Sequence, residues 1–257
     1  MKRRILLALA GAASLGVRAQ VLNLNDAVNK AGRQRMLSQR MAKAWLALVH
    51  KTESASAQQI LDRSMALFDR QLVELKAYAP SAEIRKTYVD LEAAWSDYKA
   101  ALVGNHPSRD GAGGLLNTDA RVLALAQQGT VQYEAFAAQP VSRLVNVAGR
   151  QRMLSQRMAK YYYAAALQVE AAQARVEIGK ARTDFLAALE LLRNAPQATP
   201  QIKDELALAD SQWLFFDLAL QQTAGATPKA LSDVFVTSEN LLSVMDRITG
   251  LYANLKA

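Results

Sequence analysis

Hydrophobic residues recur at helical spacing in long stretches from Leu24 onward, and short segments rich in Gly, Pro, Asn and Asp separate these stretches. This periodicity predicts amphipathic helices. They cover about residues 25–52, 56–78, 82–103, 117–138, 141–169, 173–194, 201–222 and 229–255. The segment from Gly104 to Gly114 is expected to be a loop. Four helices joined by short turns bury their apolar faces most simply as an antiparallel bundle, so the pattern predicts an all-α protein.

An internal repeat divides the chain into two similar halves. The thirteen residues AGRQRMLSQRMAK occur at Ala31–Lys43 and, unchanged, at Ala148–Lys160, 117 positions later. Core-type residues also correspond: Phe68, Leu72 and Leu75 match Phe185, Leu189 and Leu192 at the same offset, and Trp95, Tyr98 and Leu102 match Trp213, Phe216 and Leu220 at an offset of 118. We therefore expect two tandem antiparallel four-helix bundles, over residues 20–139 and 140–257. Pro140 either sits in the first turn of a new helix or kinks a nearly continuous one.

Residues 1–19 have the pattern of a cleavable signal peptide. Lys2, Arg3 and Arg4 precede an apolar run that is too short to span a bilayer comfortably, and small residues precede Gln20. The expected product is a periplasmic protein, soluble after cleavage; an uncleaved anchor is the alternative. Cleavage would lower the net charge from +8 to +4, leaving 27 basic and 23 acidic residues, which argues against a nucleic-acid partner. The absence of Cys excludes disulfides, thiolate metal sites and Cys nucleophiles.

The repeated block places an arginine in the middle of a small, apolar helix face. On a helix, one narrow stripe holds Val28, Ala31, Gly32, Arg35, Gln39, Ala42 and Leu46, and the second copy repeats it with Val145, Ala148, Gly149, Arg152, Gln156, Ala159 and Tyr163. A buried guanidinium without a counter-charge is costly, so Arg35 and Arg152 each require an anion.

The small residues of the stripe would let the two copies pack against each other with both arginines facing one gap. A planar oxyanion between them would relieve their repulsion and accept forked hydrogen bonds from both sides. The alternative is a buried structural ion pair between each arginine and an acidic residue of another helix.

Other residues of the block have simpler interpretations. Arg33, Arg40, Arg150 and Arg157 lie on a different face and are interpreted as solvated or surface-paired charges. Met36, Leu37 and Met41 are interpreted as core. Ser38 and Ser155 are expected to hydrogen-bond back along the helix, although either could donate to a ligand. Possible secondary ligand contacts are Arg33, Arg150, Ser38, Ser155, Gln39 and Gln156.

The block AGRQRMLSQRMAK resembles the P-box of the NarX and NarQ nitrate-sensing domains, and more closely the PilJ-type sensor domain of methyl-accepting transducers. The resemblance covers each four-helix half. It implies that nitrate or nitrite lies between two first helices and is held by an arginine from each, here Arg35 and Arg152. It also implies that an Asn-x-Ala-Gly stretch shapes the pocket, through Asn29, Ala31 and Gly32 in one copy and Asn146, Ala148 and Gly149 in the other.

These observations predict an exported, non-enzymatic sensor or binding module for nitrate, nitrite or a similar small oxyanion. Because the chain has no kinase or methyl-accepting region, it would signal through a membrane-bound histidine kinase or methyl-accepting receptor. The alternative is a structural or protein-interaction module of type IV pilus or chemoreceptor systems, with the repeated stripe as its docking surface. An enzyme is not expected, because His50 and His106 occur only in the first half and at no metal-ligand or nucleophile spacing. No cofactor or metal is expected.

Overall fold

The computed structural model describes residues 20–104, 106–222 and 227–255, and the predicted signal peptide lies outside them. Within these ranges the protein consists of eight helices and no strand, which confirms the all-α prediction. The helices are α1 (Leu24–Val49), α2 (Ser54–Tyr78), α3 (Ala82–Val103), α4 (Arg109–Ala137), α5 (Pro140–Ala166), α6 (Ala171–Arg193), α7 (Pro200–Gln221) and α8 (Pro228–Ala253). None of these helices is both long enough and apolar enough to cross a membrane.

Local sequence explains where most helices begin. Side chains of Asn23, Ser81, Ser108, Thr199 and Thr227 accept a hydrogen bond from the backbone N–H three residues later. Such caps satisfy backbone donors that the first turn of a helix leaves free. Pro140, Pro200 and Pro228 stand in the first turn, where the missing N–H is not needed. Pro140 thus starts a new helix, after Ala138 turns the chain with a φ of 49°.

The prediction for the start of α4 was wrong. The helix begins at Arg109, inside the segment expected to be a loop, and Oγ of Ser108 accepts a hydrogen bond from the N–H of Gly111 at 3.3 Å. A Cβ on Gly111 would lie 3.3 Å from Cη2 of Trp45, so this glycine admits a bulky ring from α1. Capping and tertiary packing therefore outweigh the low helix propensity of glycine here.

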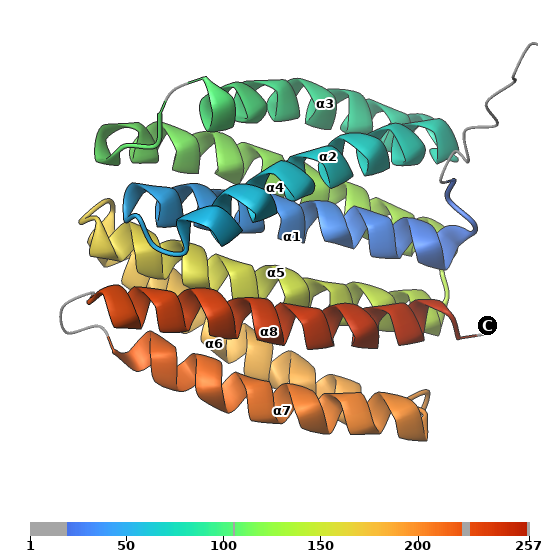
Figure 1. Cartoon of the computed structure of the whole chain (residues 1–257). Coiled ribbons are helices and arrows are strands. Elements are labelled where there is room, and N and C mark those ends of the chain that lie inside the picture. Colours follow the sequence, from blue (N-terminus) through green and yellow to red (C-terminus); the bar gives the residue numbers. More distant parts are fainter. Residues whose placement is uncertain (1–19, 105, 223–226, 256–257) are drawn as a thin grey trace, which may run out of the picture.

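The eight helices form two four-helix halves that join along α1 and α5 (Figure 1). Each half repeats one scheme: α1 packs on α2 and α4, and α5 on α6 and α8, while α3 packs on α4 and α7 on α8. The most extensive packing of all is between α1 and α5. The repeated blocks therefore lie at the centre of the molecule.

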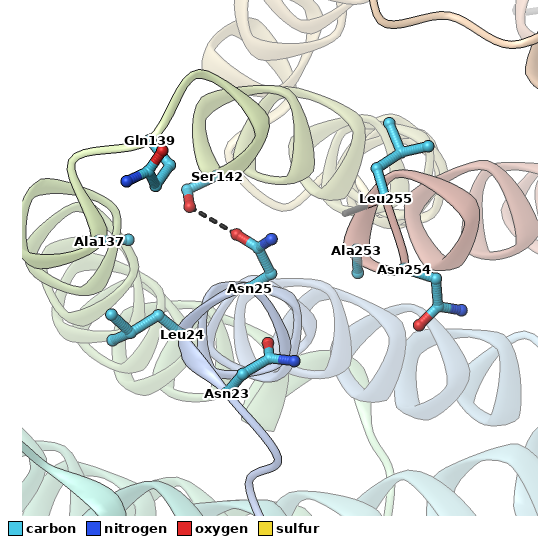
Figure 2. Close-up of a pocket in the computed structure, with 9 residues that line it drawn as sticks. All are labelled: Asn23, Leu24, Asn25, Ala137, Gln139, Ser142, Ala253, Asn254 and Leu255. Carbon is cyan, nitrogen blue, oxygen red and sulfur yellow. Dashed lines mark hydrogen bonds between the residues drawn. The ribbon is translucent and has the colours of Figure 1, made fainter. Parts of the chain in front are cut away.

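Helices α1 and α5 run parallel. At their N-terminal ends Oγ of Ser142 donates to Oδ1 of Asn25 at 2.6 Å, and at their C-terminal ends Nε2 of His50 lies 3.1 Å from the carbonyl oxygen of Tyr163. Figure 2 shows the first of these ends, where the last residues of α4 and α8 also meet around an open pocket of about 580 Å³. The two halves are thus related by a pseudo-twofold axis along the bundle.

Core contacts repeat between the halves as the sequence correspondence predicts. Phe68 stacks on Trp95 with ring centroids 4.2 Å apart, and Phe185 stacks on Trp213 at 4.6 Å. Each pair adds about 0.5–1.5 kcal/mol to the stabilisation from burial. The turn after the block repeats as well, with positive φ at Lys51, Glu53, Gln168 and Glu170.

Candidate functional site: two buried arginines between parallel helices

The two stripes predicted from the repeated block face each other across the α1–α5 interface. Every residue of both stripes is buried. Arg35, Arg152, Ala31 and Ala148 are completely buried, and Gly32 and Gly149 are buried beside them. This stripe therefore cannot serve as an exposed docking surface, which corrects that part of the protein-interaction alternative.

Gly32 and Gly149 make room for the guanidinium groups. A Cβ on Gly32 would lie 3.1 Å from Nη2 of Arg35 and 3.6 Å from Nη2 of Arg152. A Cβ on Gly149 would lie 3.2 Å from Nη2 of Arg152 and 3.7 Å from Nη2 of Arg35. Both arginines, one from each copy of the block, thus reach the same small volume beside both glycines.

Arg35 is held by neutral acceptors. Its Nη1 donates to Oε1 of Gln127 on α4 at 2.6 Å, and its Nη2 donates to Oδ1 of Asn146 on α5 at 2.7 Å and to the Asn146 carbonyl at 3.4 Å. Nδ2 of Asn146 in turn donates to Oε2 of Glu134. The Glu134 carboxylate is therefore linked to Arg35 through an intervening amide.

Arg152 is held by a carboxylate. Its Nη1 lies 2.5 Å from Oδ1 of Asp246 on α8, and its Nη2 donates to the Asn29 carbonyl on α1 at 3.1 Å. Nη2 of Arg33 lies 2.9 Å from the same oxygen of Asp246. The ion-pair alternative thus describes Arg152, whereas Arg35 pairs directly with no carboxylate of the described residues.

Burial and neighbouring positive charges disfavour the charged forms of Arg35 and Arg152. Burial and the nearby charges of Arg152 and Arg150 lower the pKa of Arg35 to about 9, with Glu134 acting in the opposite direction. Burial and Arg33 lower the pKa of Arg152 to about 10, against the effect of Asp246. Both guanidiniums remain charged at pH 7. In addition, Nε of each arginine is buried and donates no hydrogen bond within the described residues.

The remaining residues of the block are placed as follows. Oγ of Ser38 and of Ser155 donates back to the carbonyl of Arg35 and of Arg152 at 3.0 and 2.9 Å, as expected. The amides of Gln39 and Gln156 donate to Asp119 and to the Ser238 carbonyl, away from the arginines. The other arginines form partly exposed ion pairs, namely Arg33–Asp246, Arg40–Glu239, Arg150–Asp184 and Arg157–Glu177.

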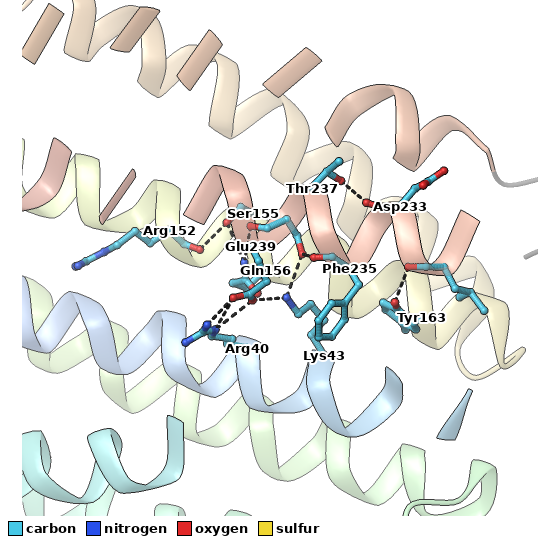
Figure 3. A network of polar contacts seen from close by, with 12 residues as sticks. Arg40, Lys43, Arg152, Ser155, Gln156, Tyr163, Asp233, Phe235, Thr237 and Glu239 are labelled. Carbon is cyan, nitrogen blue, oxygen red and sulfur yellow. Dashed lines mark hydrogen bonds and ion pairs between the residues drawn. The ribbon is translucent and has the colours of Figure 1, made fainter. Parts of the chain in front are cut away.

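A second buried polar layer, which the sequence analysis missed, lies about two turns beyond the arginines along α1 and α5. Lys43, fully buried, donates to Glu239 at 2.5 Å and to Ser238 at 3.0 Å, both on α8 (Figure 3). Its copy Lys160 donates to Asp119 on α4 at 2.7 Å. Each lysine thus pairs across to the opposite half. Acidic residues within the α4 and α8 sequences were the available signal, but those helices carry no repeated motif to draw attention to them.

Gln127 and Asp246 were also missed, although a comparison of α4 with α8 could have found them. Oγ1 of Thr130 and Oγ1 of Thr249 each donate to the carbonyl oxygen four residues earlier at 2.7 Å, and 119 positions separate these threonines. The same offset places Gln127 opposite Asp246. The two His residues are not part of the site: His50 caps α1 and His106 is exposed. Among the described residues, no cluster of His, Asp and Glu side chains could hold a metal ion.

Comparison with known families agrees with the internal symmetry. Residues 17–130 and, separately, residues 133–235 match the N-terminal region of the type IV pili methyl-accepting chemotaxis transducers, the PilJ family. The chain belongs to the PilJ family. No curated protein and no solved structure matches it significantly. The protein is therefore a tandem PilJ-type helical module of the sensor class.

Proposed function

We propose that this tandem PilJ-type module binds one small planar oxyanion, such as nitrate or nitrite, between α1 and α5. The observation that carries the proposal is the burial of Arg35 beside Arg152 with neutral amides as its direct partners. A buried cation whose charge is only indirectly compensated is stabilised by an anion. The unpaired Nε of each arginine supplies a further donor. Arginine forks suit a planar oxyanion better than lysines do.

Other residues of the two blocks would shape this site. Gly32, Ala31, Gly149 and Ala148 allow the helices and the guanidiniums to approach closely. The Asn29 and Asn146 carbonyls orient Arg152 and Arg35, each across the interface. Ser38, Ser155, Gln39 and Gln156 have other partners, so they would act on the ligand indirectly.

The proposal includes a periplasmic location and a signalling partner. A membrane-bound methyl-accepting receptor or histidine kinase would read a small relative shift of α1 and α5. This part rests on the membership of a chemotaxis transducer family. An anion that bridges both arginines contacts α1 and α5 at once, so its binding energy would bias their relative position.

Calorimetric titration of the purified protein with nitrate and nitrite tests the proposal. We expect saturable binding of one anion per chain, weakened about 100-fold or more in Arg35→Gln because a buried charge-assisted contact is lost. Arg157→Gln is the matched control. It changes an arginine of the same block that pairs with Glu177 away from the site, and it should leave affinity unchanged within twofold. A folded protein that gives no heat with either anion would contradict the proposal.

One observation favours the second candidate, a protein-interaction module. On α7 the outward face exposes Leu208, Leu214, Phe215 and Leu218. The corresponding positions of α3 carry Asp90, Ser96, Asp97 and Ala100. An apolar stripe on one half alone is typical of a surface that a partner covers. If this is the whole function, Leu214→Ser with Phe215→Ser would abolish signalling in cells, and anions would have no effect.

A further inference from the structure

The pseudo-twofold site has one charged position that breaks its symmetry. Asp246 on α8 contacts Arg152 where Gln127 on α4 contacts Arg35. Asp246 also contacts Arg33, whereas Arg150, the copy of Arg33, pairs with Asp184 at the surface. A carboxylate therefore stands on one side of the site, and an uncharged amide of similar hydrogen-bonding capacity stands on the other.

The charged side chains at the two arginines sum to a single positive charge. Three guanidiniums, those of Arg33, Arg35 and Arg152, face two carboxylates, those of Asp246 and Glu134. Arg150, which also acts on Arg35, is compensated by its own pair with Asp184. Transfer of an anion into a buried site is favourable when its charge matches the opposite charge already there and unfavourable when it exceeds it.

We propose that Asp246 sets the charge selectivity of this site, so that it accepts a monovalent oxyanion and rejects a divalent one. This inference rests on the proposed function. A monoanion would complete the neutralisation of the site. A dianion would leave an uncompensated negative charge beside the two buried arginines and the Asp246 carboxylate, which is itself only half-buried. Coulomb repulsion from Asp246 is twice as large for a dianion as for a monoanion, whatever the effective dielectric constant.

The decisive variant is Asp246→Gln, which gives the second half the side chain that the first half has in Gln127. It removes one negative charge and retains an acceptor for Nη1 of Arg152. We expect nitrate affinity to rise at least tenfold and sulfate affinity to rise by about the square of that factor, since the removed repulsion scales with ligand charge. Perchlorate, which is tetrahedral like sulfate but monovalent, separates charge from shape and should follow nitrate.

Two further variants keep the test sharp if Asp246→Gln does not fold. Glu134→Gln removes the other carboxylate without touching either arginine, because Glu134 contacts Asn146. Like Asp246→Gln, it should lower the ratio of nitrate affinity to sulfate affinity. Gln127→Glu adds a carboxylate next to Arg35, and it should weaken sulfate binding more than nitrate binding. Asp246→Glu keeps the charge and is the matched control, with an unchanged ratio.

The outcomes separate this inference from the proposed function. Two results together support both the proposed function and the role of Asp246. The natural protein binds nitrate, and the charge-removing variants raise sulfate affinity more than nitrate affinity. Nitrate binding with an unchanged ratio in these folded variants overturns the role of Asp246 and leaves the proposed function intact. Absence of binding of any anion, in the natural protein and in every folded variant, overturns the proposed function and the selectivity role with it.

Discussion

The two halves of the protein present the same thirteen residues in different surroundings. Arg35 meets amides, and its copy Arg152 meets a carboxylate. The cause lies outside the block, in α4 and α8, whose side chains differ at corresponding positions. An identical motif therefore does not create two identical sites: the helices that pack on it decide whether each arginine meets a neutral or a charged partner.

The same contrast occurs at the lysine layer. Lys160 pairs with Asp119, which is fully buried and also accepts from Gln39 at 2.8 Å. Lys43 pairs with Glu239, whose side chain is 20% exposed and also contacts Arg40. One lysine thus depends on a single enclosed carboxylate, whereas the other belongs to a network that reaches solvent.

The largest expected effect is that of Asp119→Ala, which removes the carboxylate that pairs with Lys160. The change leaves Lys160 charged and buried and removes the acceptor of Gln39, so it should lower the free energy of unfolding by about 3–5 kcal/mol. Glu239→Ala should cost about 2 kcal/mol, because Lys43 keeps the Ser238 hydroxyl at 3.0 Å and water can reach the network. Urea denaturation of both variants measures the difference. If Glu239→Ala lowers the free energy of unfolding as much as Asp119→Ala or more, the enclosed lysine does not depend on its carboxylate more than the other lysine does.

Much of this layout could be predicted from the sequence, for identifiable reasons. The stripe around Arg35 is visible because small and apolar residues recur at helical spacing, and the exact repeat marks Arg152 as its copy. The convergence of both arginines followed from glycine and alanine on that face, and the packing of α1 on α5 confirms it.

The partners of the arginines could not be predicted in the same way. Gln127 and Asp246 lie in helices that share few identical residues, so no motif marks them. Their role depends on the rotation of α4 and α8 about their axes, which tertiary packing fixes. The early start of α4 was missed for a similar reason: glycine is a poor helix former, and only the contact with Trp45 shows why Gly111 is needed.

A smaller effect, about 2 kcal/mol in the free energy of unfolding, is expected when a fall in pH protonates Glu239. Burial alone would raise the pKa of Glu239, but Lys43 and Arg40 outweigh it and lower this pKa from 4.5 to about 2. Because the folded-state pKa is the lower one, the stabilisation is complete above pH 4.5 and is lost as the pH falls toward 2. The first half has Ala120 at the corresponding position. Glu239→Gln should therefore be less stable than the natural protein at pH 7, and the difference should shrink steadily below pH 4.5 and vanish only as the pH falls through about 2.

Chemical denaturation at a series of pH values measures this convergence. Arg121→Gln is the control, since it disturbs an exposed pair with Asp97 on α3 that does not involve Glu239. A stability difference between Glu239→Gln and the natural protein that stays constant from pH 7 to pH 3 would show that Glu239 acts through packing and not through its charge.

The smallest effect, about 1 kcal/mol of coupling free energy, concerns Tyr88 and Gly129, a large and a small core residue that fit together. In the first half Tyr88 lies against Gly129, where a Cβ would be 2.9 Å from Cε2 of the ring; the second half has Leu206 and Ile248 at these positions. Gly129→Ala gains helix propensity but overpacks against the buried ring, so a net loss is expected. Tyr88→Leu removes the ring and leaves space that an alanine partly fills. The double variant should therefore be at least about 1 kcal/mol more stable than the sum of the single changes predicts. If the free-energy changes of the two single variants in urea denaturation simply add, positions 88 and 129 are not coupled as a packed pair.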